Sequence, residues 1–272
     1  MHAASFRSIG YEGTYDAFDI APPDLAGAFT RFAAEGYLGI NCTIPHKEAV
    51  MQLMTRLDGS AVRCAAVNTV KIAPDGSTTG YNTDCDGFRL SLEEQGFSFS
   101  GKRIVLLGAG GAARAVAVAC LTAGCASLVV ANRTRAKAEK LADAIREQLS
   151  ICGNDGNCGQ IGSLDNISAS GGMDTSEARQ AALDADLVVN ATSIGLNAAD
   201  PSAVPPAIFR PGQTVCDIIP VRRETATLSA ARAAGAKTVD GIGMLVHQGA
   251  AAFRIWTGLE PDVAAMRKAI SN

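Results

Sequence analysis

The sequence predicts an α/β protein of two domains, and three observations support this. The chain has 272 residues, which is enough for two hydrophobic cores. Short apolar strands alternate with helical stretches along most of the chain. A glycine-rich turn at residues 108–113 separates a buried strand from an alanine-rich helix, as in doubly wound parallel sheets. We expect residues 1–86 together with 241–272 to form an N-terminal α/β domain, and residues 87–240 to form a Rossmann-type domain.

The elements of the first domain follow from hydrophobic spacing and turn residues. We expect strands at residues 15–20, 38–44, 65–72 and 77–81, and helices at residues 24–36, 46–56 and 87–95. The segment Pro74-Asp-Gly76 predicts the turn between the last two strands. The helix at 87–95 is expected to connect the two domains.

The second domain begins with a βαβ unit. Strands are expected at residues 103–107, 127–131, 187–190, 214–217 and 238–240, and helices at residues 112–123 and 135–149. A further helix is expected at residues 244–258, in the C-terminal part of the chain that we assign to the first domain. Residues 151–173 are rich in glycine, serine and asparagine, so we expect a long irregular loop there.

Composition excludes several classes of function. Hydrophobic residues make up 47% and charged residues 19% of the chain, and the net charge is −3. This balance offers no basic surface for nucleic acid and no polybasic membrane patch. No apolar run approaches the roughly 20 residues that cross a bilayer, and no signal peptide opens the sequence. We therefore expect a cytoplasmic protein.

The eight cysteines predict neither a metal site nor a disulfide framework. None lies in a Cys-x-x-Cys pair, and the three histidines do not cluster with them. We expect most to be buried thiols, whereas Cys152 and Cys158, in the polar loop, are candidates for exposure.

The segment Gly39-Ile-Asn-Cys-Thr-Ile-Pro-His-Lys47 places a lysine where a strand gives way to an expected helix. A cation is disfavoured in the first turn of a helix, because the helix dipole is positive there. A lysine in that position tends to have a lowered pKa, which suits proton transfer. The alternative is a solvated surface lysine.

Three further polar segments are candidates to meet Lys47. Asn68 lies in an expected strand, where a buried amide needs hydrogen-bond partners, and Asp84 precedes the expected connecting helix. Gln248 lies on the apolar final helix. Each has a simpler alternative: Asn68 and Asp84 as strand-end or capping residues, and Gln248 as a local helix contact.

The turn Gly108-Ala-Gly-Gly-Ala-Ala113 has the G-x-G-x-x-A pattern of a dinucleotide-binding loop. Gly108 allows the tight turn, Gly110 lets the backbone approach a pyrophosphate, and Ala113 is small enough for close helix packing. The amides at the helix start favour phosphate binding. Lying between a strand and a helix, this match is a strong signal.

The next strand is followed by Asn132-Arg-Thr-Arg-Ala-Lys137, with no acidic residue to hold the ribose hydroxyls of NAD. The basic and polar side chains favour the 2′-phosphate of NADP instead. The alternative is a solvated basic helix start. Asn190-Ala-Thr-Ser-Ile-Gly195, after a later strand, is expected to border the nicotinamide or to form an ordinary capped loop.

These motifs, taken in order, resemble the shikimate dehydrogenase family over nearly the whole chain. They are G-x-N-x-T-x-P-x-K at 39–47, Ala66–Thr69, Gly80–Asp84, Gly108–Ala113, Asn132–Thr134, Asn190–Ser193 and 241–258. The resemblance implies hydride transfer between NADPH and the C3 carbonyl of 3-dehydroshikimate in a cleft between the domains. It implies that Lys47 and Asp84 are catalytic, and that Thr43, Asn68, Asp84 and Gln248 bind ring hydroxyls.

We also expect a set of cofactor-binding residues, a small-molecule substrate and no metal, whereas the sequence leaves open whether the protein is a monomer or a homodimer. The expected NADP contacts are Gly108, Ala109, Gly110, Gly111, Ala112, Asn132, Arg133, Thr134, Lys137, Thr192, Ile218 and Gly241.

The sequence departs from the family pattern at two places. The family begins with a strand and a Ser-x-Ser-Pro segment that grips the substrate carboxylate; here Met1–Phe6 aligns with the helix that follows, so we expect a fragment or a different natural start. Pro220 stands where the family usually has a substrate-contacting tyrosine. Arg222 or Arg223 is a candidate to contact the carboxylate instead, but an ordinary exposed loop arginine is the favoured interpretation.

Two other interpretations remain open at this point. One is a quinate/shikimate dehydrogenase paralogue, which comparison of kcat/KM for the two acids would distinguish. The other is a catalytically weakened NADP-binding homologue, which would bind NADPH tightly without turning over shikimate. An unrelated redox enzyme with the same glycine loop would leave Lys47, Asn68 and Asp84 as coincidences.

Overall fold

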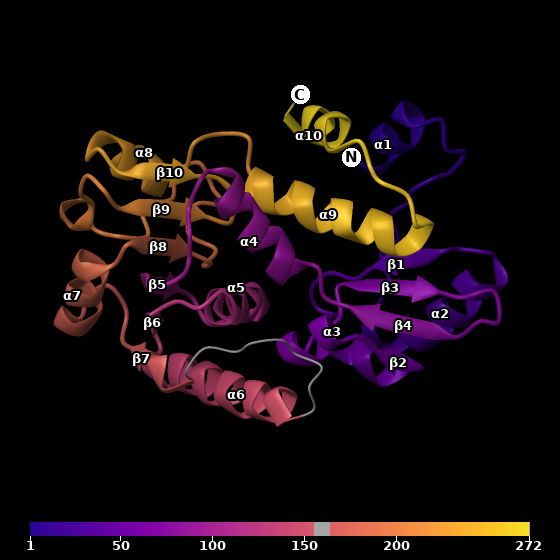
Figure 1. The fold of residues 1–272 in the computed structure, drawn as a ribbon, viewed down its shortest axis with the longest axis horizontal. Coiled ribbons are helices and arrows are strands. Elements are labelled where there is room, and N and C mark those ends of the chain that lie inside the picture. Colours follow the sequence, from indigo (N-terminus) through magenta and orange to yellow (C-terminus); the bar gives the residue numbers. More distant parts are fainter. Residues whose placement is uncertain (155–163, 272) are drawn as a thin grey trace. The chain divides into compact units, whose positions relative to one another are not determined.

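The computed structural model describes residues 1–154 and 164–271 (Figure 1). Two compact units make up the chain: unit 1 is Met1–Gly87 with Val246–Asn272, and unit 2 is Phe88–Leu245. The chain passes from one unit to the other twice, at 87/88 and at 245/246. Both of these crossings fall inside continuous helices, α4 (Asp84–Glu94) and α9 (Gly241–Thr257). The sequence placed these crossings at 86/87 and 240/241, because helix interiors carry no linker composition that would mark a boundary.

Unit 1 contains a four-stranded sheet in the order β1-β3-β4-β2. Its strands are β1 (Gly39–Asn41), β2 (Arg56–Leu57), β3 (Thr69–Ile72) and β4 (Thr78–Tyr81), and its other helices are α1 (His2–Ser8), α2 (Leu25–Ala34), α3 (Gly59–Cys64) and α10 (Val263–Ser271). Short 3-10 helices lie at Pro22–Asp24 and Ala49–Leu53. The core packs Phe32 of α2 and Val50 against Val70 of β3. The expected β3–β4 hairpin is present, antiparallel, with Ala73 and Ser77 closing its turn.

The helix expected at residues 46–56 is wrong. Residues 44–48 form turns, a 3-10 helix covers Ala49–Leu53, and β2 follows. The main-chain oxygen of Lys47 accepts a hydrogen bond of 2.8 Å from the Val67 amide, so it is not available to an α-helical ladder. The Met51 amide instead bonds to Glu48, the shorter 3-10 spacing. Lys47 therefore lies in a turn before a short 3-10 helix, and the helix-dipole argument does not apply to it.

The strand expected at residues 15–20 is also wrong. Residues 11–21 have no regular structure, although their side chains alternate. A strand needs a neighbour for its backbone hydrogen bonds. Within the described residues, no strand pairs with this segment, and β1 is an edge strand that pairs only with β3.

His2 is enclosed by aromatic rings in unit 1. Its side chain is buried and stacks on Tyr15 with 4.4 Å between ring centroids, and Phe253 and Trp256 lie at 6.5 and 5.2 Å. Neither ring nitrogen has a hydrogen-bond partner among the described residues. Burial, with the positive charge of the amino terminus, lowers the pKa of His2 to about 4 from 6.5. The imidazole is therefore neutral in the folded protein.

This burial predicts acid sensitivity of unit 1. Between pH 6.5 and about 4 the unfolded chain binds a proton at His2 that the folded chain does not. The free energy of unfolding should thus decrease as the pH is lowered from 6.5 to about 4, by up to about 3 kcal/mol. Denaturant titrations over that range should show the fall, and His2→Phe should flatten it. An equal slope in His2→Phe would show that other groups cause it.

Unit 2 is a doubly wound α/β domain, as expected. Its six parallel strands have the order β10-β9-β8-β5-β6-β7. They are β5 (Arg103–Leu107), β6 (Ser127–Ala131), β7 (Ile167–Ser170), β8 (Leu187–Asn190), β9 (Thr214–Asp217) and β10 (Lys237–Val239). Besides α4 and α9, the helices are α5 (Gly111–Thr122), α6 (Arg135–Asn154), α7 (Ser176–Asp184) and α8 (Ala226–Ala233), with 3-10 turns at Leu164–Asn166 and Pro206–Ile208.

Both faces of this sheet are buried, which explains the nearly continuous apolar sequence of β5. Val105 and Leu107 belong to the core shared with α7 and α8. Ile104 and Leu106 alternate with them and are equally buried. Because period-2 alternation sends neighbouring residues to opposite faces, β5 needs apolar side chains throughout.

The long loop expected at residues 151–173 is only partly correct. α6 continues to Asn154, and β7 occupies Ile167–Ser170, paired with β6 from Leu128 to Ala131. Cys152, a candidate for exposure, is buried on α6. Residues 155–163, with Cys158, lie outside the described residues. The seven described cysteines are free thiols, and all but Cys85 are buried.

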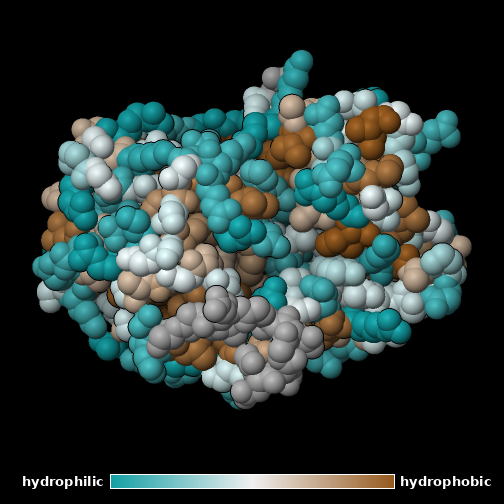
Figure 2. Space-filling model, in the orientation of Figure 1, coloured by the Kyte–Doolittle hydropathy of each residue, from teal (hydrophilic) through white to brown (hydrophobic). Residues whose placement is uncertain are grey.

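The surface drawn in Figure 2 is mainly hydrophilic, with smaller hydrophobic patches between the polar side chains. In the part of the chain that the structure describes, no helix combines the length and apolarity needed to cross a membrane.

Candidate active site

Lys47 and Asp84 form an ion pair in unit 1. The Lys47 Nζ atom donates to Asp84 Oδ2 over 2.7 Å, and the two side chains are 25% and 12% exposed. In eight other ion pairs of the described residues at least one side chain is 40% or more exposed, so the Lys47–Asp84 pair is better shielded from solvent than these. Coulomb attraction is less screened there than at an open surface. Both side chains nevertheless keep some exposure to solvent.

Asn68 holds the other oxygen of the carboxylate. Its Nδ2 donates to Asp84 Oδ1 over 2.8 Å and to the Thr83 hydroxyl over 3.1 Å. Its Oδ1 accepts from the Thr83 amide at 2.8 Å, which fixes the orientation of the side-chain amide because a backbone N–H can only donate. Thr69 Oγ1 donates to the same oxygen. Asn68 is thus fully buried and fully partnered, and Asp84 is held from two sides.

Asp84 begins α4 rather than preceding it. Its amide donates to the Asn82 side-chain oxygen over 3.0 Å, and the Asn82 side chain in turn donates to Ala66 O over 3.0 Å. Asp84 and Asp86 both lie in the first turn of α4, where a negative charge interacts favourably with the amide dipoles. The anion Asp84 therefore occupies the start of α4, and the cation Lys47 contacts it from the turn at residues 44–48.

The other two predicted substrate residues, Thr43 and Gln248, lie in the same unit. Thr43 is exposed, and its hydroxyl donates only to the Ile44 carbonyl, over a long 3.3 Å. Gln248 lies on α9.

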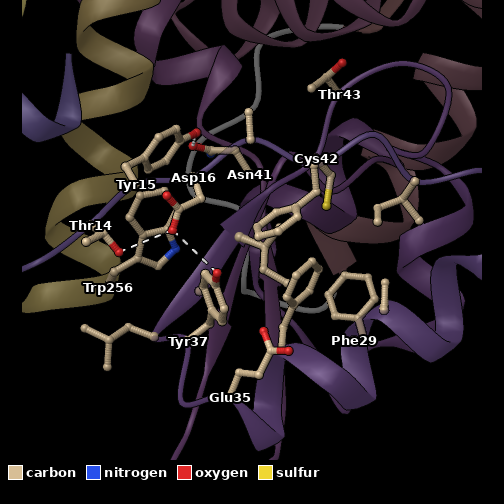
Figure 3. A pocket seen from close by; sticks show the side chains of 18 of the residues that line it. Thr14, Tyr15, Asp16, Phe29, Glu35, Tyr37, Asn41, Cys42, Thr43 and Trp256 are labelled. Atoms are coloured by element: carbon tan, nitrogen blue, oxygen red, sulfur yellow. Dashed lines mark hydrogen bonds between the residues drawn. The ribbon is translucent and has the colours of Figure 1, made fainter.

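A groove of about 1220 Å³ opens beside β1 (Figure 3). Aromatic side chains form much of its wall, and Tyr37 and Thr14 both donate to Asp16. Trp256 crosses β1 at Gly39, where a Cβ atom would lie 2.2 Å from the indole. His46 and Thr43 line the groove, but Lys47 and Asp84 do not.

The glycine loop of unit 2 has the geometry of a phosphate cradle. Gly108 has φ +108°, and a Cβ atom there would lie 2.7 Å from the Ala191 carbonyl, so no larger residue fits. In front of Gly110 and Gly111 there is open space. Gly110 caps α5 without any side-chain hydrogen bond, and Ala113 is completely buried. The free amides at the start of α5 can therefore receive a pyrophosphate.

The basic turn lies directly beside this loop. The Gly108 amide donates to the Ala131 carbonyl over 2.9 Å, so the segment that starts at Asn132 is adjacent to the glycine turn. Asn132 Nδ2 donates to the Thr134 carbonyl and shapes the turn. Arg135 pairs with Glu139 and Glu177, whereas Arg133 is exposed and has no ion pair within the described ranges. Arg133 is the cation available for a 2′-phosphate, and Lys137 lies one turn further on the exposed side of α6.

Three other predicted cofactor residues follow the parallel strands at the same edge of the sheet. Thr192 follows β8 and donates to Asn190 Oδ1 over 2.7 Å; Ile218 follows β9, and its amide donates to Asn190 O. Gly241 follows β10 and starts α9 against the Ile218 carbonyl. β5 and β8 are neighbours in the sheet, and the strands that follow them in the chain add in opposite directions from this pair. Doubly wound sheets bind ligands at such a switch point.

Asp217 and Arg223 support this edge of the sheet; Asp217 was missed in the sequence, and Arg223 was considered there only as a contact for the substrate carboxylate. Asp217 is buried at the end of β9, where burial raises the pKa of its carboxyl, and it accepts from Asn190 Nδ2 at 3.1 Å and Thr225 Oγ1 at 2.7 Å. Arg223 donates to the carbonyls of Gly195 and Leu196. Both therefore fix the loop after β8. The only sequence signal for Asp217 is an acidic residue closing an apolar strand.

Comparison with known proteins gives consistent matches along the chain. Residues 1–70 match the shikimate dehydrogenase substrate binding domain, residues 91–155 the shikimate / quinate 5-dehydrogenase family, and residues 241–270 the shikimate 5′-dehydrogenase C-terminal domain. The chain is 44% identical over 271 residues to the shikimate dehydrogenase (NADP(+)) of Moorella thermoacetica, covering 99% of this chain and 86% of that protein.

Solved structures agree with the sequence matches. A shikimate dehydrogenase crystallised with NADP+ superposes with a TM-score of 0.87 at 39% identity, covering 99% of this chain and 88% of that one. The enzyme from Thermus thermophilus, crystallised with NADP(H) and shikimate, gives a TM-score of 0.82 at 34% identity, covering 99% and 91%.

Proposed function

The chain belongs to the shikimate dehydrogenase family, and from this premise we propose that it catalyses the reversible NADP-dependent reduction of 3-dehydroshikimate to shikimate. The observation that carries the proposal is the partly buried Lys47–Asp84 pair at 2.7 Å. Proton transfer needs a positioned acid beside the reacting oxygen, and Lys47 is that group. The family membership supplies the identity of the substrate.

Each polar residue of unit 1 has a role in this proposal. The Lys47 ammonium gives its proton to the substrate oxygen that gains negative charge, and the neutral amine takes the proton back in the oxidative direction. Asp84 orients Lys47 and accepts from a ring hydroxyl with its remaining lone pairs. Asn68 holds Asp84; because both of its amide hydrogens are used, it must release Thr83 to bind a hydroxyl itself. Thr43 and Gln248 contact other hydroxyls.

The residues of unit 2 fit NADP. When bound, NADPH would supply the hydride, and the backbone of Gly108, Ala109, Gly110, Gly111 and Ala112 would hold its pyrophosphate. Asn132, Arg133, Thr134 and Lys137 hold the adenosine end, and Thr192, Ile218 and Gly241 the nicotinamide end. The open space at Gly110 and the unpaired charge of Arg133 support this assignment.

The direct test is shikimate-dependent reduction of NADP+ by the purified chain. We expect turnover with shikimate, weaker turnover with quinate, and a preference for NADP+ over NAD+. Tight NADPH binding without turnover of either acid would instead identify a catalytically silent member of the family. Chromatography with light scattering would decide between monomer and homodimer, and cell fractionation would test the cytoplasmic location.

Arg133 should determine the choice of cofactor. Arg133→Ala removes a charged hydrogen-bond donor from the 2′-phosphate, so KM for NADPH should rise roughly tenfold while KM for NADH stays unchanged. Arg135→Ala is the matched control, because Arg135 is held by Glu139 and Glu177. Equal changes for both cofactors in Arg133→Ala would remove this residue from phosphate recognition.

A further inference from the structure

Two cysteines meet immediately beside the proposed catalytic carboxylate. The sulfur atoms of Cys64 and Cys85 are 2.8 Å apart. Cys64 is the last residue of α3, and Cys85 is the second residue of α4, directly after Asp84. Neither thiol has a role in the proposed reaction.

The segments that carry the two thiols are already joined. The Asn82 amide donates to Ser60 Oγ of α3 over 3.1 Å, and Asn82 Nδ2 donates to Ala66 O over 3.0 Å. A disulfide has an S–S distance of about 2.05 Å, so closing the 2.8 Å separation requires a movement of about 0.8 Å. A small shift of the first turn of α4, which carries both Asp84 and Cys85, is enough for a movement of this size, and neither helix has to unfold.

The two thiols differ in exposure in the way that a reactive pair requires. Cys64 is 1% exposed, whereas Cys85 is partly exposed. Cys85 is therefore the residue nearer to solvent, although its sulfur is itself buried against Cys64, and Cys64 is in place to resolve the product of a slow oxidation. The hydrogen bond with Cys64 and burial raise the pKa of the Cys85 thiol, so the exchange should take minutes to hours.

We propose that Cys64 and Cys85 form a reversible disulfide that lowers the activity of the adjacent site. With a small-molecule disulfide such as oxidised glutathione, the Cys85 thiolate attacks one sulfur and releases one glutathione thiolate. The Cys64 thiolate then attacks the Cys85 sulfur of the mixed disulfide and releases the second. The protein loses two electrons and two protons, and the oxidant is reduced to two thiols.

The consequence for activity rests on the proposed function. Closing the disulfide draws Cys85 toward Cys64, and Asp84, its neighbour in the chain, carries the hydrogen bonds to Lys47 and Asn68. Misplacement of a catalytic group by about 1 Å can cost up to ~10²-fold in rate, so a shift of slightly less should lower turnover by roughly tenfold. A cross-link over a separation of 21 residues should also raise the melting temperature by roughly 5 °C.

The experiment treats the whole chain with oxidised glutathione and maps disulfides by peptide mass spectrometry. We expect a Cys64–Cys85 peptide that has lost two hydrogen atoms, a raised melting temperature and reduced turnover, all reversed by dithiothreitol. Cys64→Ala and Cys85→Ala should each lose these responses, and Cys125→Ala, in unit 2, should keep them. The mapping and the melting do not depend on activity, so they test the disulfide even if shikimate is not the substrate.

Three outcomes would overturn the proposal. Glutathione retained on Cys85 without a Cys64–Cys85 peptide would show that Cys64 does not resolve it. A peptide linking other cysteines would assign the response elsewhere. The expected cross-link with unchanged turnover would refute the effect on the active site.

Discussion

Lys47→Ala should lower kcat by ~10²-fold or more while the affinity for NADPH stays close to that of the unaltered protein. The reason is that the Lys47 ammonium group contacts Asp84 at 2.7 Å, and the Lys47 side chain is only 25% exposed. Removing it takes away the proton donor, whereas the glycine loop of unit 2 is untouched. Steady-state kinetics with shikimate and NADP+, combined with fluorescence titration of NADPH, would measure both quantities.

A second substitution separates proton transfer from charge. Lys47→Arg keeps a cation that can pair with Asp84, but a guanidinium does not give up its proton in proteins. Turnover should therefore be nearly as low as in Lys47→Ala, with a smaller loss of melting temperature. Lys71→Ala is the matched control, since Lys71 is an exposed lysine of β3 in the same unit. Near-native kcat in Lys47→Arg would show that only the charge is needed.

The parts of the fold that the sequence predicted well are those determined by local pattern. β5, the glycine turn and α5 follow from an apolar run, a G-x-G-x-x-A turn and an alanine-rich stretch, and all three lie within a residue of their expected positions. β7 was missed because Ile167–Ser170 contains a single large apolar residue. It becomes a strand because the edge of β6 offers a complete ladder of hydrogen bonds.

Errors arose where a distant partner determines the backbone. The apolar spacing after Lys47 favours a helix, but the Val67 amide takes the Lys47 carbonyl and the chain turns instead. The alternation at residues 15–20 favours a strand, but no described strand pairs with it. α7 and α8 begin with a pattern that can be recognised in the sequence. Thr175 and Thr225 each cap a helix, because the side chain accepts a hydrogen bond from the amide three residues later.

The residues of the candidate site could likewise be selected from the local sequence, whereas their contacts depend on distant partners. Lys47, Asn68 and Asp84 were selected from the sequence as residue types in unexpected places, and the structure brings them into one network. Their exact relation was not predictable, because it depends on the side chains of Thr83 and Asn82. Lys47 does not lie at a helix start, as the sequence had predicted, but in a turn. The charged residue at a helix start is Asp84, the first residue of α4, and Lys47 forms an ion pair with it.

Asp84→Asn should lower kcat/KM for shikimate by about 10²-fold, as much as loss of the lysine. The substitution preserves shape and leaves an oxygen to accept from Asn68, but it removes the charge that orients Lys47 and holds a substrate hydroxyl. Breaking one side of a largely buried pair also leaves the Lys47 ammonium without its partner. KM for NADPH should not change, because no predicted cofactor contact lies in unit 1.

Asp86→Asn is the control that isolates the ion pair from the helix. Asp86 lies in the same first turn of α4, so it shares the interaction with the helix dipole, but its side chain is exposed. It should cost only a few tenths of a kcal/mol in stability and leave turnover near native. The double variant Lys47→Ala with Asp84→Asn should be little worse than either single one, because the two groups act as a unit. Fully additive losses, near ~10⁴-fold, would mean that Lys47 and Asp84 act independently and that their contact is not part of the mechanism.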